Sequence, residues 1–167
     1  MYELRIARPD EYEQAGKVTV AGYDADGFLT RSDGVDDHYA PKLLDAATRA
    51  AETDLVVAVD ETGTVIGTVT WCPVGSPWRE LATRPDQAEF RMLSVAPEAR
   101  RQGVARALVE WCLDRARKDE MTEVVLCSLT VMTAAHTLYG SFGFQRAPEL
   151  DWQPVPSVLL WGFRLPL

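Results

Sequence analysis

Strand-like patterns of apolar and polar residues recur along the whole chain. Strict alternation predicts a half-buried strand, and a short continuous apolar run predicts a strand that is covered on both faces. The stretch YELRIAR alternates, whereas LVVAV and EVVLCS are nearly continuous apolar runs. From these patterns we predict strands at Tyr2–Arg8, in a hairpin over Asp54–Trp71, and at Glu89–Val95, Glu123–Ser128 and Ser157–Leu165.

Helical spacing of apolar residues occurs between these strands. The clearest case is Gly103–Lys118, where an apolar stripe lies opposite a stripe of charged residues. We predict further helices from Pro9 to about Val20, at Asp36–Glu52 and at Thr133–Phe142. The order strand, helix, strand over Glu89–Ser128 is typical of a βαβ unit, so its two strands are expected to run parallel.

The order of these elements predicts an α/β fold with a mixed sheet, in which hairpins come first and one parallel crossover follows. The chain has 167 residues, of which 47% are apolar and 25% are charged. This size and composition are ordinary for one compact domain. Because no linker or change of composition divides the sequence, we expect residues 1–167 to form a single domain.

The charge balance and the cysteines narrow the class of protein. The net charge is −8, which argues against a nucleic-acid partner, because phosphate contacts need a basic surface. No apolar run is long enough to span a membrane, and the start lacks the plan of a signal peptide. The three cysteines lie among apolar residues, as thiols do in a reducing compartment, and no Cys–His spacing suits a metal. We therefore expect a cytoplasmic protein with no metal and no membrane or nucleic-acid partner.

The segment RRQGVA, Arg100 to Ala105, lies between a predicted strand and the clearest helix. A helix N-terminus presents unpaired N–H groups and the positive end of the helix dipole, so it can bind an anion. Gly103 lets the backbone approach an oxygen closely, Arg100 and Arg101 add charge-assisted donors, and Arg106 follows one turn into the helix. The same pattern also suits an ordinary loop with a glycine before a helix. The turn alone leaves both interpretations open.

A second motif follows in the segment AAHTLYGSFGFQR. Together the two segments resemble the GCN5-related N-acetyltransferase (GNAT) superfamily. The family's acyl-CoA motif, R/Q-x-x-G-x-G/A, is matched by Arg100, Gly103 and Ala105. Its later motif, a short helix with Leu-Tyr that ends in Gly-Phe, is matched by Leu138, Tyr139, Gly143 and Phe144. The resemblance covers Glu89–Arg146, about a third of the chain.

The resemblance implies a splayed, mostly antiparallel sheet of about six or seven strands, with one parallel βαβ crossover, flanking helices and coenzyme A in the gap. It implies acetyl-CoA as co-substrate and no metal. The backbone of Leu93 and Val95 would meet the pantetheine arm, and the amides of Gln102–Arg106 would meet the diphosphate. The residues expected at the cofactor are Leu93, Val95, Arg100, Arg101, Gln102, Gly103, Val104, Ala105, Arg106 and Tyr139.

The resemblance also implies direct transfer of an acetyl group from the thioester to a primary amine. Tyr139 is expected as the acid that protonates the leaving thiolate, although a tyrosine on an amphipathic helix is also typical of a core. Glu89 is expected as the base that accepts the proton of the amine, because acids near this point do so in some relatives. The alternative interpretation of Glu89 is a strand-end carboxylate that pairs with Arg91. His38 and His136 are the alternative candidates for the base.

The acceptor is expected to be a small molecule. Phe28, His38, Trp78 and Glu89 are the residues expected around it, and aromatic side chains beside carboxylates suit a cationic or aromatic amine. Three points stay open: whether the acceptor is instead a protein N-terminus or lysine, whether the chain is a non-catalytic acyl-CoA-binding module, and whether it forms a homodimer. Met132 stands where many relatives have asparagine, and its thioether cannot donate the hydrogen bond of an amide.

Overall fold

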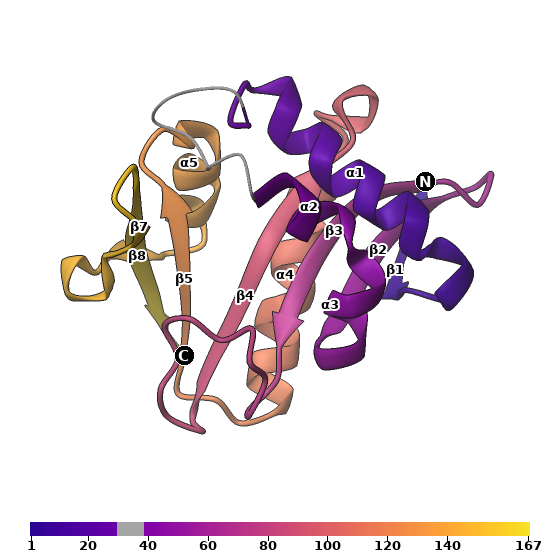
Figure 1. Ribbon diagram of the computed structural model, residues 1–167. Coiled ribbons are helices and arrows are strands. Elements are labelled where there is room, and N and C mark those ends of the chain that lie inside the picture. Colours follow the sequence, from indigo (N-terminus) through magenta and orange to yellow (C-terminus); the bar gives the residue numbers. More distant parts are fainter. Residues whose placement is uncertain (30–38) are drawn as a thin grey trace.

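The computed structural model describes residues 1–29 and 39–167. Figure 1 shows strands and helices interleaved along the chain. The strands are β1 (Tyr2–Ile6), β2 (Asp54–Asp60), β3 (Val65–Cys72), β4 (Gln87–Val95), β5 (Glu123–Leu129), β6 (Gln145–Arg146), β7 (Trp152–Val155) and β8 (Val158–Pro166). The helices are α1 (Tyr12–Ala25), α2 (Tyr39–Leu44), α3 (Ala46–Glu52), α4 (Val104–Lys118) and α5 (Thr133–Ser141).

The strands of the described residues join one eight-stranded sheet in the order β1-β2-β3-β4-β5-β8-β6, and β7 pairs with β8. All neighbours are antiparallel except β4 and β5, which are parallel and are connected through α4. The expected mixed sheet with one parallel crossover is confirmed. The sheet has eight strands rather than six or seven, because the two-residue β6 and the Pro154-containing β7 carry no strand pattern that the sequence could reveal.

The parallel strands β4 and β5 are paired over only part of their length. Their register joins residues 87–89 of β4 to residues 123–125 of β5 and then stops. β4 continues to Val95 and β5 to Leu129 without a partner between them. Figure 1 shows the two strands diverging toward the end of the sheet where α5 lies. The backbone groups that face this gap are therefore left without the hydrogen bonds of a sheet.

A bulge in β4 changes the face on which its side chains lie. Between two of their pairs, β4 carries one more residue than β3, and Met92 within this step has a φ of 56°. Beyond the bulge, Leu93 and Val95 pack against the same core cluster as α4. Strict alternation along β4 would put both residues on the face of Glu89 and Arg91, but the extra residue reverses the alternation.

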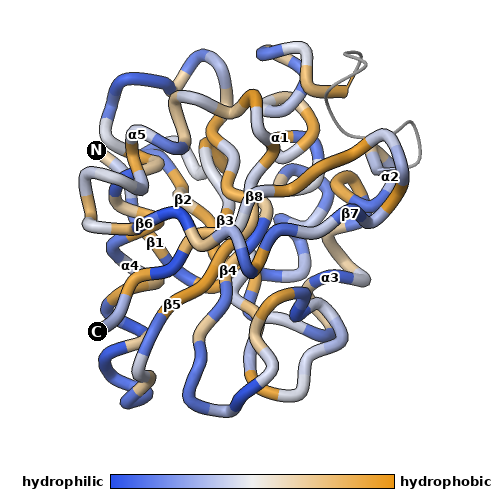
Figure 2. The backbone as a smooth tube through the Cα atoms, turned by 90° about the vertical axis from the view of Figure 1, so that its left-hand side faces the viewer, coloured by the Kyte–Doolittle hydropathy of each residue, from blue (hydrophilic) through white to orange (hydrophobic). Residues whose placement is uncertain are grey.

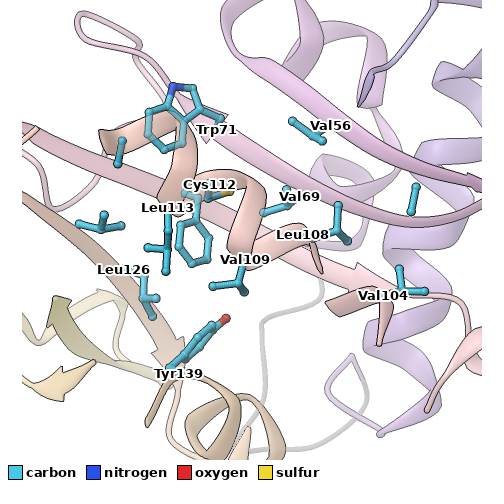
Figure 3. Close-up of a cluster of buried hydrophobic side chains, with 14 of the residues drawn as sticks. Val56, Val69, Trp71, Val104, Leu108, Val109, Cys112, Leu113, Leu126 and Tyr139 are labelled. Carbon is cyan, nitrogen blue, oxygen red and sulfur yellow. The ribbon is translucent and has the colours of Figure 1, made fainter. Parts of the chain in front are cut away.

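Helices cover both faces of the sheet. On one face, α4 and α5 pack over a large apolar cluster that includes Trp71, Leu108 and Tyr139 (Figure 3). On the other face, α1 and α3 pack over a smaller cluster that includes Leu55 and Val57. Figure 2 shows the hydrophobic segments along the strands in the middle of the fold and mainly hydrophilic residues in the loops below them.

The end of α1 is held against β4 through Gly22. A side chain at Gly22 would come within 1.9 Å of the Ser94 hydroxyl oxygen. That hydroxyl group lies 3.2 Å from the carbonyl oxygen of Val18 and 3.1 Å from that of Thr19, to which it donates. The close approach fixes the C-terminal end of α1 beside the unpaired part of β4.

The single helix expected at Asp36–Glu52 is two helices where it is described, α2 and α3. Asp45 separates them and caps α3, because its carboxylate accepts hydrogen bonds from the Thr48 amide at 3.2 Å and the Thr48 hydroxyl at 2.7 Å. An aspartate at an N-cap position interrupts a continuous helix and starts a new one. Helix α1 extends further than expected, to Ala25 rather than Val20.

The contact between α1 and α2 depends on a glycine, which gives a test of the packing. A Cβ at Gly16 would lie 2.0 Å from the carbonyl oxygen of Leu44, whereas a Cβ at Gly140 in α5 would meet nothing within 4 Å. We expect Gly16→Ala to lower the free energy of unfolding by about 1–3 kcal/mol. Gly140→Ala, the matched control, should leave it unchanged or raise it by up to about 1 kcal/mol. Urea denaturation measures both, and equal stabilities would contradict the described packing.

Candidate functional site

The unpaired end of β4 and the segment that follows β5 border a cavity of about 590 Å³. Its walls come from the end of β4, the turn before α4, the first turn of α4, the start of α5 and the end of α1. Most of the residues expected at the cofactor line it: Leu93, Val95, Arg100, Arg101, Gly103, Val104, Ala105 and Arg106. Gln102 and Tyr139 were also expected there but do not line the cavity, whereas Leu138, the neighbour of Tyr139 in the sequence, does.

The turn before α4 presents backbone N–H groups at this cavity. Gly103 is the N-cap residue of α4 and has a φ of 79°, in the left-handed region that favours glycine. Arg101 also has a positive φ, of 64°. No side chain caps the helix, so the N–H groups of its first turn lack a side-chain acceptor. The positive end of the α4 dipole therefore faces the cavity that Val104, Ala105 and Arg106 line.

The three arginines of this turn have different partners. Arg100 donates to both carboxylate oxygens of Asp26 at 2.9 Å and to the carbonyl oxygen of Gly22 at 3.1 Å. Arg106 donates to the Ser141 hydroxyl oxygen at 2.7 Å. Arg101 is exposed. Asp26 thus neutralises Arg100, and Arg101, Arg106 and the helix N-terminus provide the positive charge of the cavity.

A second cavity, of about 310 Å³, lies on the other side of the gap. Tyr23 and Met132 line both cavities, so the two are neighbours across the separated strands. The second cavity has polar and charged lining residues from α2, β4 and the loop before β4, including Lys42, Glu80 and Arg91. Its apolar wall comes from the ends of β4 and β5 and from the β7–β8 hairpin: Met92, Leu129, Trp152, Val155, Val158 and Leu160.

The residues expected around the acceptor are distributed differently. Phe28 lines the first cavity and not the second. Trp78 and Glu89 line neither; the Trp78 indole N–H donates to a carboxylate oxygen of Glu52 at 2.7 Å. His38 lies outside the described residues.

Glu89 is buried beneath the loop that precedes β4. Its carboxylate accepts hydrogen bonds of 2.9–3.1 Å from the backbone N–H groups of Glu80, Leu81 and Ala82, and its exposed fraction is 0%. Burial raises the pKa of this carboxyl group, and the N–H donors oppose that rise. Arg91 pairs with Glu80 at 3.3 Å, not directly with Glu89. The contacts of Glu89 thus hold the loop in place.

Tyr139 lies in the large core cluster, where its ring packs near Phe90, Phe144 and Phe163 at centroid distances of 6.1, 5.8 and 6.2 Å. Figure 3 shows its hydroxyl oxygen directed toward the side of the cluster where Val109 of α4 lies. Burial raises the pKa of Tyr139 well above its usual value of 10, so the phenol is protonated at neutral pH. Tyr139 is thus a buried, protonated phenol within the core cluster.

His136 contacts the end of β5 and not the cavities. Its Nε2 lies 3.1 Å from the Ser128 hydroxyl oxygen, and its ring packs against Trp161 and Phe163 at 5.7 and 5.0 Å. Desolvation lowers the pKa of His136 below 6.5, so the imidazole is neutral at pH 7. Ser128, but not His136, lines the second cavity.

Several residues of the second cavity had little signal in the sequence. Nothing in the residue types or spacing around Lys42 and Glu80 singles them out for an acceptor site. Arg91 was considered only as a partner of Glu89. Trp152 belongs to β7, which has no recognisable strand pattern, so only the tertiary fold brings it to the cavity.

The described residues contain neither a metal-binding cluster nor a membrane-spanning helix. No cluster of three or more His, Cys, Asp or Glu side chains in residues 1–29 and 39–167 is arranged to hold a metal ion. Within the same ranges, no helix combines the length and apolar character of a membrane span.

Comparisons with known proteins match this geometry. N-acetyltransferase 8 from Rattus norvegicus is 36% identical over 109 residues, which make up 62% of this chain and 47% of that relative. The chain spans less than half the length of the first curated relatives that it matches.

Solved structures of low sequence identity share the fold. The PaiA N-acetyltransferase of Thermoplasma acidophilum, in complex with coenzyme A, has a TM-score of 0.76 and 12% identity, with 100% of this chain and 99% of that chain covered. The yncA structure from Salmonella typhimurium, with its cofactor acetyl-CoA, has a TM-score of 0.65 and 19% identity, with 100% and 94% covered.

A family model decides the relationship. The model described as the acetyltransferase (GNAT) family matches residues 23–144, which is more than half of the chain. The matched region includes the gap between β4 and β5, the turn before α4 and helix α5. The chain therefore belongs to the acetyltransferase (GNAT) family.

Proposed function

We propose that residues 1–167 form one acyltransferase domain that moves an acetyl group from acetyl-CoA to the primary amine of a small molecule. The observation that carries this proposal is the first cavity, where an uncapped helix N-terminus and unpaired strand backbone border one space. Solved structures of the same fold that contain coenzyme A or acetyl-CoA support the choice of ligand.

The donor would lie along the gap between β4 and β5. The pantetheine arm carries amide groups that can pair with the free backbone of Leu93 and Val95, as an added strand would. The diphosphate would accept hydrogen bonds from the first-turn N–H groups of α4, with Arg101 and Arg106 adding charge. This arrangement brings the thioester to the neighbourhood of Met132, which lines both cavities.

The transfer needs no covalent enzyme intermediate, because a thioester is already activated. The amine nitrogen attacks the thioester carbon, a C–N bond forms, and the C–S bond breaks to release the coenzyme A thiolate. We propose Tyr139 as the acid that gives its proton to this sulfur, because it belongs to the Leu-Tyr motif whose Leu138 lines the first cavity. Solvent then returns a proton to the phenolate.

The proton of the amine needs an acceptor in the second cavity. We propose Glu80 for this role, because its carboxylate lines that cavity and its side chain is 29% exposed. Glu89 is buried under three backbone N–H donors, so we propose it as a positioning residue that fixes the loop carrying Glu80. A base is needed because removing the proton from a lysine-like ammonium at pH 7 costs about 4–5 kcal/mol.

A small acceptor is favoured by the second cavity, whose volume of about 310 Å³ is in the range of small-molecule pockets. The experiment that tests the function is a screen for acetyl-CoA-dependent thiol release with amines, amino acids, polyamines and short peptides. Release with a small amine supports the proposal, release only with peptides would favour a protein acetyltransferase, and binding of acetyl-CoA without release would favour a binding module. The cytoplasmic location and the homodimer stay predictions from the sequence.

Gly103→Val should weaken coenzyme A binding by at least about tenfold. A β-branched residue resists the left-handed conformation, and its side chain would stand between the backbone and the diphosphate. Gly63→Val is the matched control, because Gly63 has a similar φ of 83° but lies in the turn between β2 and β3. Titration calorimetry on the folded variants measures the affinity. Normal affinity of Gly103→Val would remove this turn from the binding site.

Tyr139→Phe should lower kcat by about 10²–10⁴-fold, the range for loss of a general acid, with little change in coenzyme A affinity. The ring and its packing are kept, so the effect reports on the hydroxyl group alone. Tyr12→Phe on α1 is the control for loss of a phenol elsewhere in the chain. Turnover like that of the unchanged chain would show that Tyr139 is only a core residue.

Glu89→Gln should destabilise the loop before β4, because the amide NH₂ group would face backbone N–H groups that now donate to a carboxylate. We expect the free energy of unfolding to fall by about 1–3 kcal/mol, with faster hydrogen exchange at the amides of residues 80–82. Glu61→Gln in the β2–β3 turn is the control. A large loss of kcat with unchanged stability and exchange would instead support the role of Glu89 as base.

A further inference from the structure

We infer that the acceptor is an α-amino acid with an apolar side chain, whose carboxylate binds Arg91 and Lys42 while its amino group lies at Glu80. The inference rests on the proposed acetyl transfer and names the substrate class of the second cavity. It replaces the cationic or aromatic amine expected from the sequence, because the charged residues that line this cavity are not those that the sequence suggested.

Arg91 is a charged group built into the wall of the cavity. Its side chain is only 11% exposed. The guanidinium donates to the Trp78 carbonyl oxygen at 3.1 Å and to the Tyr39 hydroxyl oxygen at 3.5 Å, and it pairs with Glu80 at 3.3 Å. A guanidinium has five N–H donors in a planar fork that fits a carboxylate, so these contacts leave donors for a ligand.

Among the described residues around the cavity, one cation has no carboxylate partner. Among the described residues that line it, Arg91 and Lys42 are positive and Glu80 is negative. Glu80 pairs with Arg91, whereas no carboxylate of the described chain pairs with Lys42. An anionic group on the acceptor would supply the missing charge, and a cation such as a polyamine would meet repulsion from both Arg91 and Lys42.

Opposite charges lie close together in the cavity, as they do in an amino acid. Glu80 and Arg91 are 3.3 Å apart at their nearest charged atoms. The ammonium and carboxylate groups of an α-amino acid are separated by a single carbon, so they can oppose Glu80 and Arg91 at the same time. Glu80 then holds the ammonium whose proton it removes before attack on the thioester. A peptide N-terminus has an uncharged amide in place of the carboxylate and gains less from Arg91.

The rest of the wall is apolar and suits a hydrophobic side chain. Met92 and Leu129 come from the central strands, and Trp152, Val155 and Leu160 come from the β7–β8 hairpin. Burying an aliphatic or aromatic side chain against such a wall contributes about 25 cal/mol per Å² of apolar surface. The cavity therefore has a charged end for the amino-acid backbone and an apolar end for the side chain.

Matched pairs of acceptors test the inference, since each pair differs only by the carboxylate: phenylalanine against phenethylamine, and leucine against isopentylamine. Phenylalanine amide has nearly the shape of phenylalanine but lacks the negative charge of its carboxylate, so it separates the effect of charge from the effect of shape. We expect kcat/KM for the carboxylate member to exceed that of its partner by about 10–100-fold, the effect of a hydrogen bond to a charged group. Equal or faster acetylation of the carboxylate-free amine in both pairs would overturn the inference.

Substitutions assign the effect to the two cations. Lys42→Met should raise KM for phenylalanine about tenfold, leave KM for phenethylamine unchanged, and leave coenzyme A affinity unchanged. Lys118→Met at the end of α4 is the matched control. Arg91→Lys keeps the charge and loses the planar fork, so it should also raise KM for phenylalanine selectively. Equal effects on both members of a pair would overturn the assignment.

The outcomes separate this inference from the proposed function. If simple amines or peptides release thiol and no carboxylate-bearing acceptor does, the amino-acid inference is wrong and acetyl transfer stands. If the unchanged chain does not bind coenzyme A, the proposed function is wrong, and the inference that rests on it falls as well.

Discussion

The separation of β4 from β5 is the constraint on which the rest of the site depends. Two parallel strands that pair over residues 87–89 and 123–125 and then part leave backbone donors and acceptors without partners at the centre of the sheet. Such groups are costly to bury unless something pairs with them. A ligand with amide groups of its own can restore this pairing, which is why the gap is better explained as a binding site than as a defect.

The two cavities on either side of this gap differ in chemistry. The first has the uncapped N-terminus of α4 and Arg101, so it suits an anionic ligand. The second combines Arg91, Lys42 and Glu80 with an apolar wall, so it suits a ligand that carries both charges and a hydrophobic group. The bulge at Met92 contributes to the division, because it turns Leu93 and Val95 toward α4 while Arg91 stays on the opposite face.

The sequence predicted the parts of the fold that local patterns control. The amphipathic stripe of α4, the buried run of β5 and Gly103 before the helix carry their own signals, and the strands and turn are found where those signals lie. The second cavity was beyond such reasoning. Arg91, Trp152 and Lys42 come from elements far apart in the chain, and the position of Glu80 depends on the loop that Glu89 holds. The alternating pattern also assigns the residues after Met92 to the wrong face of β4, because the sequence pattern does not reveal the single extra residue of the bulge.

Hydrogen exchange of backbone amides with and without coenzyme A tests the central claim most directly. We expect binding to slow exchange at the amides of residues 90–95 in β4 and of residues 102–106 at the start of α4, because the ligand supplies their missing partners. The hairpin of β2 and β3 should exchange at the same rate in both states. Binding of coenzyme A without protection in either of the two predicted segments would contradict the account.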